Sequence, residues 1–244
     1  MCLKNRVKIS LIIPCYNEEE SIPLLISSCK RFAESRNIEI IIVNNGSSDG
    51  SKKLLEEYIH QYKFLRVVNI EKNQGYGNGI VEGLRHASGD ILSWTHADLQ
   101  TNPEDIMIGI NLFEQSSNPE KLFLKGRRYG RPIVDTFFTI GMSFFETILM
   151  RTPMWDINAQ PTMFHRTFFN SWELPPKDFS LDLYAYFMAS IRQLEIKRFK
   201  VKFGERVYGM SHWNISYKEK YKFIKRTFIY SFILKKRLDS NDKN

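Results

Sequence analysis

Short apolar runs alternate with amphipathic stretches along the first half of the chain. Aliphatic and β-branched runs, which are typical of buried parallel strands, occur at 7–14, 38–43, 64–70 and 89–95. A stretch with helical spacing follows each run, at 21–34, 49–62, 76–87 and 103–115. This repeated alternation predicts an α/β fold with a mostly parallel sheet and helices on both faces.

The second half continues the pattern less regularly. Further strands are predicted at 121–125, 162–165 and 195–203, and further helices at 132–150 and 179–193. The helix at 132–150 is apolar around most of its circumference. Its polar residues form one stripe, made of Asp135, Thr139, Ser143 and Glu146. Such a helix is either buried in the protein or faces lipid or an acceptor, and the sequence leaves both readings open.

Polar residues gather where the first, second and fourth strands end. These clusters occupy 16–18, 44–49 and 96–100. The carboxyl ends of parallel strands meet at one edge of a sheet, and ligands of such sheets bind there. Asp98 and Gln100 bring oxygen donors to this edge, which suits a divalent cation and a diphosphate.

Positive charge is concentrated at the C-terminus. The formal net charge is +8, and residues 217–244 alone hold nine Lys/Arg against three Asp/Glu, which is +6. Apolar residues recur there at close to helical spacing, so a basic amphipathic helix is predicted over 217–238. Such a tail suits an anionic membrane surface or an acidic protein, or is a solvated helix face. Nucleic-acid binding is not expected, because no base-reading motif accompanies the charge.

Cysteine usage and hydropathy bear on the compartment. The 3 cysteines form no cluster, which argues against a disulfide framework or a zinc site and favours a reducing compartment. The first residues lack the apolar core of a secretion signal, and no run of about 18 apolar residues is present to span a bilayer. We therefore expect a cytoplasmic protein that is at most peripheral on the inner face of the membrane.

Five segments have an order and a spacing that resemble a known family. They are PCYNEEESI at 14–22, IIIVNNGSSDGS at 40–51, NQGYGNGIVEGLRHASGDILSWTHADLQ at 73–100, KGRR at 125–128 and GERVYGMSHW at 204–213. Together they resemble glycosyltransferase family 2, in the branch of the dolichol-phosphate mannose synthases and the bacterial polyprenyl-phosphate sugar transferases. The resemblance implies a GT-A (Rossmann-like) domain over 1–213, followed by the basic helical tail at 214–244. It also implies a UDP- or GDP-linked sugar donor, Mg²⁺ or Mn²⁺, and inversion at the anomeric carbon.

The resemblance assigns nucleotide-binding positions residue by residue. They are Pro14, Tyr16, Asn17, Glu18, Asn44, Asn45, Ser47, Gly75, Ala97 and Ser211. Asn44 and Asn45 stand where the family usually has two aspartates. An amide keeps a carbonyl acceptor and gains a donor, so the choice of base stays open. Gly75 and Gly79 match a glycine-rich helix start, for which ordinary turn chemistry is the alternative.

The family's Asp-x-Asp metal motif reads His96-Ala97-Asp98 in this chain. The resemblance makes Asp98 and Gln100 the metal ligands, with diphosphate oxygens and water completing the shell. His96 is a poor ligand for Mg²⁺ and an acceptable one for Mn²⁺. Its alternative roles are a hydrogen bond to a phosphate and simple packing.

The resemblance also assigns phosphate-binding residues. Arg127, Arg206 and Ser211 match positions that contact phosphates, and a guanidinium suits this task because its fork of donors pairs with phosphate oxygens. An ordinary surface ion pair is the alternative for each arginine. His212 stands where the family often has lysine, so its positive charge depends on pH.

The acceptor decides whether a catalytic base is needed. For a hydroxyl acceptor, Asp182 is the better candidate for the base; Asp178 is the second, with a helix cap as its alternative role. A polyprenyl phosphate is already ionised and needs no base. The predicted catalytic set is therefore Asp98, Asp182, Arg127 and Arg206.

We expect an inverting glycosyltransferase that moves a sugar from a nucleotide sugar to a polyprenyl (dolichyl or undecaprenyl) phosphate at the cytoplasmic face of the membrane. A transferase that acts on a glycan or protein hydroxyl is one alternative. The other is a non-catalytic homologue that binds nucleotide sugars, which the replaced carboxylates at 44, 45 and 96 motivate.

Overall fold

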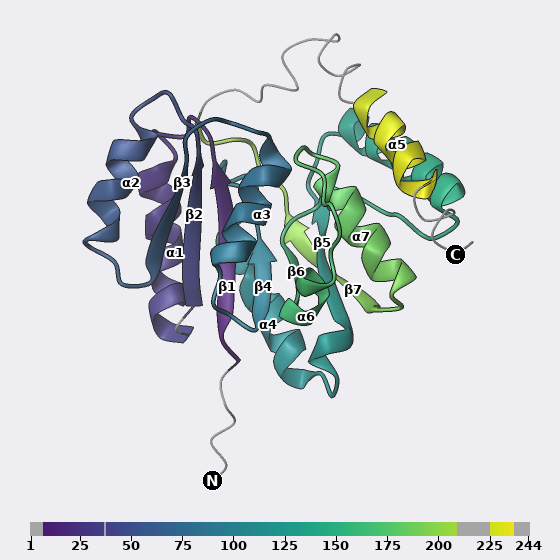
Figure 1. The fold of residues 1–244 in the computed structure, drawn as a ribbon, viewed down its shortest axis with the longest axis horizontal. Coiled ribbons are helices and arrows are strands. Elements are labelled where there is room, and N and C mark those ends of the chain that lie inside the picture. The colour runs from purple at the N-terminus through teal and green to yellow at the C-terminus, as the bar shows by residue number, and fades with distance from the viewer. Residues whose placement is uncertain (1–6, 37, 209–224, 237–244) are drawn as a thin grey trace.

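The computed structural model describes residues 7–36, 38–208 and 225–236 (Figure 1). The strands are β1 (Ile9–Cys15), β2 (Ile38–Asn45), β3 (Leu65–Ile70), β4 (Ile91–Trp94), β5 (Leu122–Tyr129), β6 (Thr162–His165) and β7 (Glu195–Lys202). The α-helices are α1 (Ile22–Arg36), α2 (Ser51–Ile59), α3 (Tyr76–His86), α4 (Ile106–Gln115), α5 (Ile133–Met150), α6 (Arg166–Asn170) and α7 (Leu181–Ile191). A further helix at 225–236 is called the tail helix below.

The strands form one seven-stranded sheet in the order β3-β2-β1-β4-β6-β5-β7. β6 is antiparallel to β4 and β5, and the other pairings are parallel. The predicted mostly parallel α/β sheet is therefore confirmed. Because β1, β2 and β4 run in the same direction, the polar clusters that follow them lie at one edge of the sheet, as predicted.

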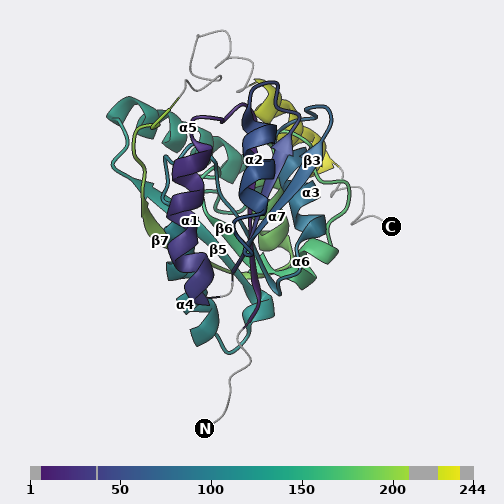
Figure 2. The same ribbon diagram turned by 90° about the vertical axis from the view of Figure 1, so that its left-hand side faces the viewer.

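A hydrophobic core lies on each face of the sheet. Successive strand residues point to opposite faces, so Leu11 and Ile13 join one core while Ile12 joins the other. Helices α1, α2 and α4 cover the first face, and α3, α6 and α7 cover the second (Figures 1 and 2). The cores hold the strands rigidly, so the loops at the carboxyl edge start from fixed positions.

The tail helix lies beside α5 and returns the chain to the second core (Figure 1). Phe145 of α5 packs on Phe228 with ring centroids 4.0 Å apart, and Leu234 is 3% exposed within that core. The described part of the predicted tail is thus helical and packed on the rest of the chain. The predicted domain boundary between 213 and 214, and the predicted helix at 217–224, lie outside the described residues.

Helix α5 turns its polar stripe toward the protein. Ser143 and Glu146 are 2% and 0% exposed. Ser143 Oγ accepts a hydrogen bond from the Asp156 N–H (3.0 Å), and Glu146 Oε1 accepts one from Ser231 Oγ of the tail helix (2.7 Å). The side chain of Asp135, which the sequence places in the same stripe, lies outside the described residues.

The opposite side of α5 is apolar and exposed. Five residues between 49% and 74% exposed make up this surface, called the apolar stripe below: Ile133, Phe137, Ile140, Phe144 and Ile148. The sequence left open whether this helix is buried in the protein or faces lipid or an acceptor. For these five residues, the prediction of burial is wrong. A continuous exposed apolar surface on a helix is typical of an interaction site. Across the described ranges, no helix combines the length and the hydropathy that crossing a bilayer requires.

Two helical glycines give a matched test of this packing. A Cβ at Gly83 in α3 would lie 2.4 Å from Ile12 Cγ2, whereas a Cβ at Gly141 in α5 meets nothing within 4 Å. Gly83→Ala is expected to lower the free energy of unfolding by about 1–3 kcal/mol through overpacking. Gly141→Ala is expected to raise it by up to about 1 kcal/mol through helix propensity. Urea unfolding measures both, and equal signs for the two variants would contradict this packing.

Glu146 gives a pH dependence with a definite sign. Burial raises the pKa of Glu146 from 4.5 to about 7, against the opposing effect of the Ser231 hydrogen bond. Between these two pH values the folded state binds more protons than the unfolded state, so stability falls as pH rises through that window. Glu146→Gln lacks the titrating carboxyl and should not lose stability in this window. Its free energy of unfolding relative to that of the wild type should therefore rise by on the order of 3 kcal/mol from pH 4 to pH 8.

Urea unfolding at both pH values measures this difference. Glu20→Gln, which removes a carboxyl that is exposed rather than buried, is the control variant. A Glu146→Gln effect that is the same at both pH values would show that the carboxyl stays ionised when buried.

Candidate active site

The loops after β1 and β2 are tied together by hydrogen bonds. The Asn17 N–H donates to Ser47 Oγ (3.1 Å), and the Ser48 N–H donates to Asn17 Oδ1 (2.8 Å). The Gly50 N–H donates to Glu19 Oε2 (2.8 Å). Asn17 has a φ of 54°, in the left-handed region that asparagine tolerates better than most residues. The predicted nucleotide-binding segments are thus braced against each other by their own side chains.

Within the first of these loops, Tyr16 is the residue best placed to meet a base. It is 40% exposed at the carboxyl edge of the sheet, where an aromatic face can stack on a nucleobase. Pro14 lies in β1 and faces α3, because a Cβ at Gly79 would lie 3.3 Å from Pro14 Cβ. Ala97 is 4% exposed within the first core, so only its backbone can contribute to a ligand site.

The two amides that replace the family's aspartates are buried. Asn44 Oδ1 accepts from the Ser47 N–H (3.2 Å), and its Nδ2 donates to Asn69 Oδ1 (2.9 Å). Asn45 Nδ2 donates to the Gly75 carbonyl (2.9 Å), while its Oδ1 is buried without a hydrogen-bond partner among the described residues. A buried acceptor of this kind lowers stability by about 1–3 kcal/mol. Asn45 Oδ1 is thus the acceptor of this pair that is left without a partner, and it is closed to solvent.

The turn after β4, residues 95–100, holds the predicted metal ligands and is called the metal turn below. Leu99 has a φ of 58°, and Asp98 Oδ1 accepts from the Gln100 N–H (3.2 Å). The segment that follows β7 is fastened to this turn, because the Gly204 N–H donates to the Gln100 carbonyl (2.8 Å). Gln100 Nε2 in turn donates to the Gly204 carbonyl (3.3 Å). The amide thereby presents its oxygen away from this contact.

Asp98 and Gln100 each supply one oxygen donor of the kind that Mg²⁺ or Mn²⁺ takes, and their role as metal ligands stays a prediction. Asp98 Oδ2 and Gln100 Oε1 have no hydrogen-bond partner in the part of the chain that the structure describes, and both are hard oxygen donors. In that same part there is no group of three His, Cys, Asp or Glu side chains that could enclose an ion. The donors therefore suit an ion that is held jointly by protein, diphosphate and water, rather than an all-protein cage.

His96 takes part in a column of stacked rings. Its ring lies 5.3 Å from that of Tyr76 at an interplanar angle of 19°, and Tyr76 lies 4.5 Å from Phe179 at 10°. Arg226 of the tail helix lies 5.6 Å from the Phe179 ring centroid. Of the roles open to His96, the structure supports packing. The column also connects the tail helix with the metal turn.

The two predicted phosphate-binding arginines have different surroundings. Arg206 is paired with Glu18, whose pKa is raised by burial although Arg206 opposes that shift. An incoming phosphate would compete with Glu18 for Arg206. Arg127 is exposed at the end of β5, two residues beyond Lys125 and therefore on the same face of the sheet. Ser211 and His212 lie outside the described residues.

Asp182 lies in a buried polar cluster. It is 1% exposed, and its Oδ1 lies 3.4 Å from Lys125 Nζ and accepts from Gln160 Nε2 (2.6 Å). Lys125 is itself 0% exposed and also donates to Thr162 Oγ1 (2.9 Å). Burial lowers the pKa of Lys125 to about 8, against the attraction of Asp182. The carboxylate of Asp182 is thus engaged inside the protein rather than presented to an acceptor.

Tyr76 joins the buried cluster to the metal turn. Its hydroxyl accepts from Gln160 Nε2 (3.3 Å). Burial raises the pKa of Tyr76 well above its ordinary value, and the Asp182 and Asp98 carboxylates add to this shift. The hydroxyl therefore stays protonated. Asp178, the second candidate base, forms an ion pair with Arg226 (3.2 Å), and its Oδ1 accepts from the Ser180 N–H (2.9 Å).

Sequence reasoning missed the partners of Asp182. A lone lysine inside the apolar run LFLKG is a signal for a buried charge, because Lys125 there requires a counter-ion in the core. Gln160 carries a weaker signal, as a polar residue just before the short strand β6.

The glycines at the start of α3 pack against the chain before α7. Gly75 has a φ of 113°, and a Cβ there would lie 2.3 Å from the Lys177 carbonyl oxygen. A Cβ at Gly77 would lie 2.5 Å from the Pro176 carbonyl oxygen. Turn chemistry and close packing therefore account for Gly75, and its contact with a nucleotide stays a prediction.

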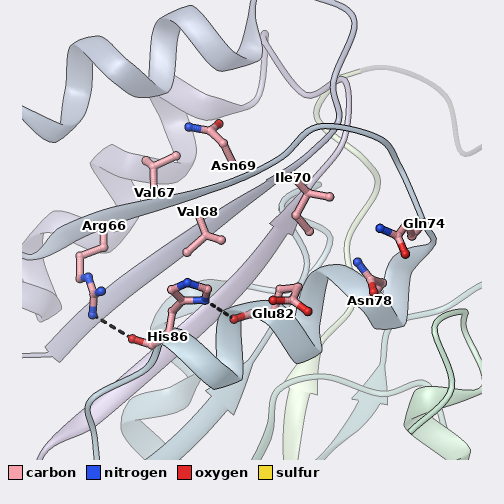
Figure 3. Close-up of a pocket in the computed structure, with 9 residues that line it drawn as sticks. All are labelled: Arg66, Val67, Val68, Asn69, Ile70, Gln74, Asn78, Glu82 and His86. Atoms are coloured by element: carbon pink, nitrogen blue, oxygen red, sulfur yellow. Dashed lines mark hydrogen bonds between the residues drawn. The ribbon is translucent and has the colours of Figure 1, made fainter. Parts of the chain in front are cut away.

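A cavity of about 460 Å³ lies between β3 and α3 (Figure 3). Its lining includes Asn69, Asn78 and Glu82, and none of the predicted catalytic or metal-binding residues. Asn69 is its link with the site, through the hydrogen bond to Asn44. The carboxyl ends of β1, β2 and β4, which carry the predicted nucleotide- and metal-binding residues, are therefore the candidate active site.

Comparisons with known proteins bear on the family and the fold. Residues 10–171 match Glycosyl transferase family 2. A segment of 104 residues is 40% identical to undecaprenyl-phosphate 4-deoxy-4-formamido-L-arabinose transferase from Proteus mirabilis (strain HI4320). That match covers 41% of this chain and 31% of the relative, so it spans about a third of the relative's length.

Solved structures share the architecture. Glucosyl-3-phosphoglycerate synthase from Mycobacterium tuberculosis, in complex with Mn²⁺, UDP and phosphoglyceric acid, superposes with a TM-score of 0.71 at 17% identity, over 94% of this chain and 78% of that one. A mannosyltransferase from Pyrobaculum calidifontis, in complex with GDP-Man and Mn²⁺, gives 0.64 at 17% identity, over 86% of this chain and 59% of that one. The predicted GT-A fold is confirmed, and the chain belongs to glycosyl transferase family 2.

Proposed function

We propose that this protein transfers a sugar, with inversion, from a UDP- or GDP-linked donor to a polyprenyl phosphate. The observation that carries the choice of acceptor is the burial of Asp182 against Lys125. A hydroxyl acceptor needs a base within hydrogen-bonding reach, and this carboxylate is occupied in the core. A phosphate acceptor is already ionised, so the same site can serve it without a base.

The chemistry balances without a proton transfer from the acceptor. A phosphate oxygen of the acceptor forms a bond to the anomeric carbon from the side opposite the leaving group. The bond from that carbon to the donor's diphosphate oxygen breaks, and the nucleoside diphosphate leaves with the electron pair. The configuration at the anomeric carbon is inverted.

The residues of the candidate active site bind and orient the donor. Tyr16 stacks on the base. Arg127 and Arg206 bind the diphosphate and stabilise its growing charge. Asp98 and Gln100 would hold Mg²⁺ or Mn²⁺, which supplies Lewis-acid stabilisation of the leaving diphosphate when bound.

The relatives support the acceptor and the metal. The name of the Proteus mirabilis relative specifies undecaprenyl phosphate. The two solved structures hold Mn²⁺ with UDP in one case and GDP-Man in the other, so either base suits the fold. We therefore keep both donors in the proposal and leave the sugar to experiment.

The outer surface supports action at a membrane. The apolar stripe on α5 and the basic tail helix lie side by side, and such a pair suits the interface of an anionic bilayer. This surface would bring the candidate active site to a lipid-linked acceptor. We propose the cytoplasmic face, where nucleotide sugars are made available to enzymes of this kind.

A transfer assay tests the proposed function. The full chain, with Mn²⁺ and a panel of UDP- and GDP-linked sugars, is supplied with decaprenyl phosphate or with the neutral alcohol decaprenol in detergent. We expect transfer to the phosphate and none to the alcohol. Transfer to the alcohol as well would support a hydroxyl acceptor, and nucleotide binding without transfer or donor hydrolysis would support a non-catalytic homologue.

A paired substitution separates the two roles of Asp182. Asp182→Asn alone leaves Lys125 buried without its counter-ion, which should destabilise the fold by about 3–5 kcal/mol and obscure the catalytic effect. Lys125→Met combined with Asp182→Asn removes both charges and keeps an acceptor for Gln160. We expect this double variant to melt near the wild type and to transfer to decaprenyl phosphate within about tenfold of its rate. A folded double variant that has lost about 10²–10⁴-fold in rate would identify Asp182 as a base.

A further inference from the structure

A groove along the tail helix has no part in the chemistry described so far. Its volume is about 360 Å³. It is lined by Asp178, Lys225, Arg226, Ile229, Tyr230 and Ile233. Five of these six residues come from the tail helix, and the sixth comes from the segment just before α7.

The groove has a basic end and an apolar end. Lys225 and Arg226 are exposed in the first turn of the described helix. Ile229 and Ile233, one and two turns further on, are 50% and 43% exposed. The rise from residue 225 to residue 233 is about 12 Å. A ligand that complements this face has an anionic head and an apolar chain that starts directly behind it.

Asp178 orients the basic end without neutralising it. Its Oδ2 lies 3.2 Å from Arg226 Nε, and Lys225 adds a second positive charge, so these three groups sum to +1. A guanidinium has five donors in a planar fork and can bind a carboxylate and a phosphate together. The ion pair with Asp178 therefore holds Arg226 in place for an anion.

The basic end adjoins the candidate active site. Phe179 follows Asp178, packs beneath Arg226 and stacks on Tyr76, which stacks on His96 in the metal turn. These direct ring contacts place the groove and the metal turn on either side of one aromatic column. A head group at the basic end would lie across this column of three rings from the turn that holds Asp98 and Gln100.

The apolar end belongs to the helix pair that carries the apolar stripe. Phe228, Ser231 and Lys235 of the tail helix contact α5, and Lys235 Nζ donates to the Leu149 carbonyl (2.8 Å). The groove occupies another side of the same helix. The exposed Ile229 and Ile233 of the groove and the apolar stripe of α5 thus lie on two neighbouring helices.

We propose that this groove binds the lipid-linked acceptor, with the phosphate at Lys225 and Arg226 and the first prenyl units along Ile229, Tyr230 and Ile233. The inference rests on the proposed function and deepens it, because it places the acceptor on the tail helix. A free inorganic phosphate lacks the apolar part and should bind far more weakly.

Photocrosslinking of the full chain locates the acceptor without any need for the sugar donor. The probe is a prenyl phosphate with a diazirine in its second prenyl unit, in detergent micelles, and the same prenyl alcohol without phosphate is the control. We expect the phosphate probe to label peptides that contain Ile229, Tyr230 or Ile233, and unlabelled decaprenyl phosphate to compete. Labelling that maps elsewhere, or that the alcohol matches, overturns the inference.

Binding measurements on variants test the basic end. Lys225→Ala with Arg226→Ala should weaken binding of the phosphate probe at least about tenfold, since each removes a charged hydrogen-bond donor, and should leave the weak alcohol binding unchanged. Lys236→Ala, an exposed lysine of the same helix outside the groove, is the charge control and should bind like the wild type. Equal losses in both variants would reduce the effect to general electrostatics and overturn the proposed site.

The outcomes for the inference and for the proposed function are distinguishable. A wild type that transfers sugar to decaprenyl phosphate, yet labels outside the groove, refutes the groove alone. A wild type that neither binds the phosphate probe better than the alcohol nor transfers sugar to decaprenyl phosphate refutes the acceptor class, and the groove with it.

Discussion

The buried ion pair of Lys125 and Asp182 joins the parts of the chain on which the candidate site depends. Lys125 is on β5 and Asp182 is on α7, while Gln160 and Thr162 bring in the start of β6 and Tyr76 brings in α3. A buried pair of this kind adds little net stability, but either charge is costly when left alone. The pair therefore acts mainly on geometry. It holds β5, β6, α3 and α7 in one arrangement. It also engages the Asp182 carboxylate, which is then not available as a catalytic base.

A second constraint shapes the outer surface. Ser143 Oγ and Glu146 Oε1 of α5 accept hydrogen bonds from inside the protein, from the Asp156 backbone and from Ser231 of the tail helix, while Glu146 Oε2 is buried with no partner among the described residues. Because these polar side chains find their partners in the protein, the apolar side of the helix must face outward. The tail helix, by covering one side of α5, both completes the second core and presents its own basic end beside α7. One packing arrangement thus connects a candidate membrane surface, the proposed acceptor groove and the candidate donor site.

The sequence predicted those features that depend on local pattern. The strands, the polar strand ends and the Asp98–Gln100 turn all follow from hydrophobic periodicity and the meeting of parallel strands at one edge. The direction in which α5 faces did not follow, because periodicity defines a stripe without saying which side meets the core. The sequence also did not predict the hydrogen bond between Asn44 and Asn69 or the contact between Asp182 and Lys125. Both pairs join residues that are far apart in the chain. Lys125 was the long-range partner with the clearest local signal, as a lysine inside an apolar strand, and Gln160 had a weaker one.

In the proposed site, a turn with a single carboxylate, Asp98, holds the metal together with the donor's diphosphate. Titration of Mn²⁺ followed by electron paramagnetic resonance, with and without UDP or GDP, tests it most directly. We predict that the protein binds Mn²⁺ weakly on its own and at least about tenfold more tightly with nucleotide, because phosphate oxygens then complete the metal's coordination shell. Asp98→Asn should lose this nucleotide-dependent binding. His96→Phe, which keeps a ring against Tyr76, should retain it. Unchanged binding in Asp98→Asn, or its loss in His96→Phe, would contradict the account.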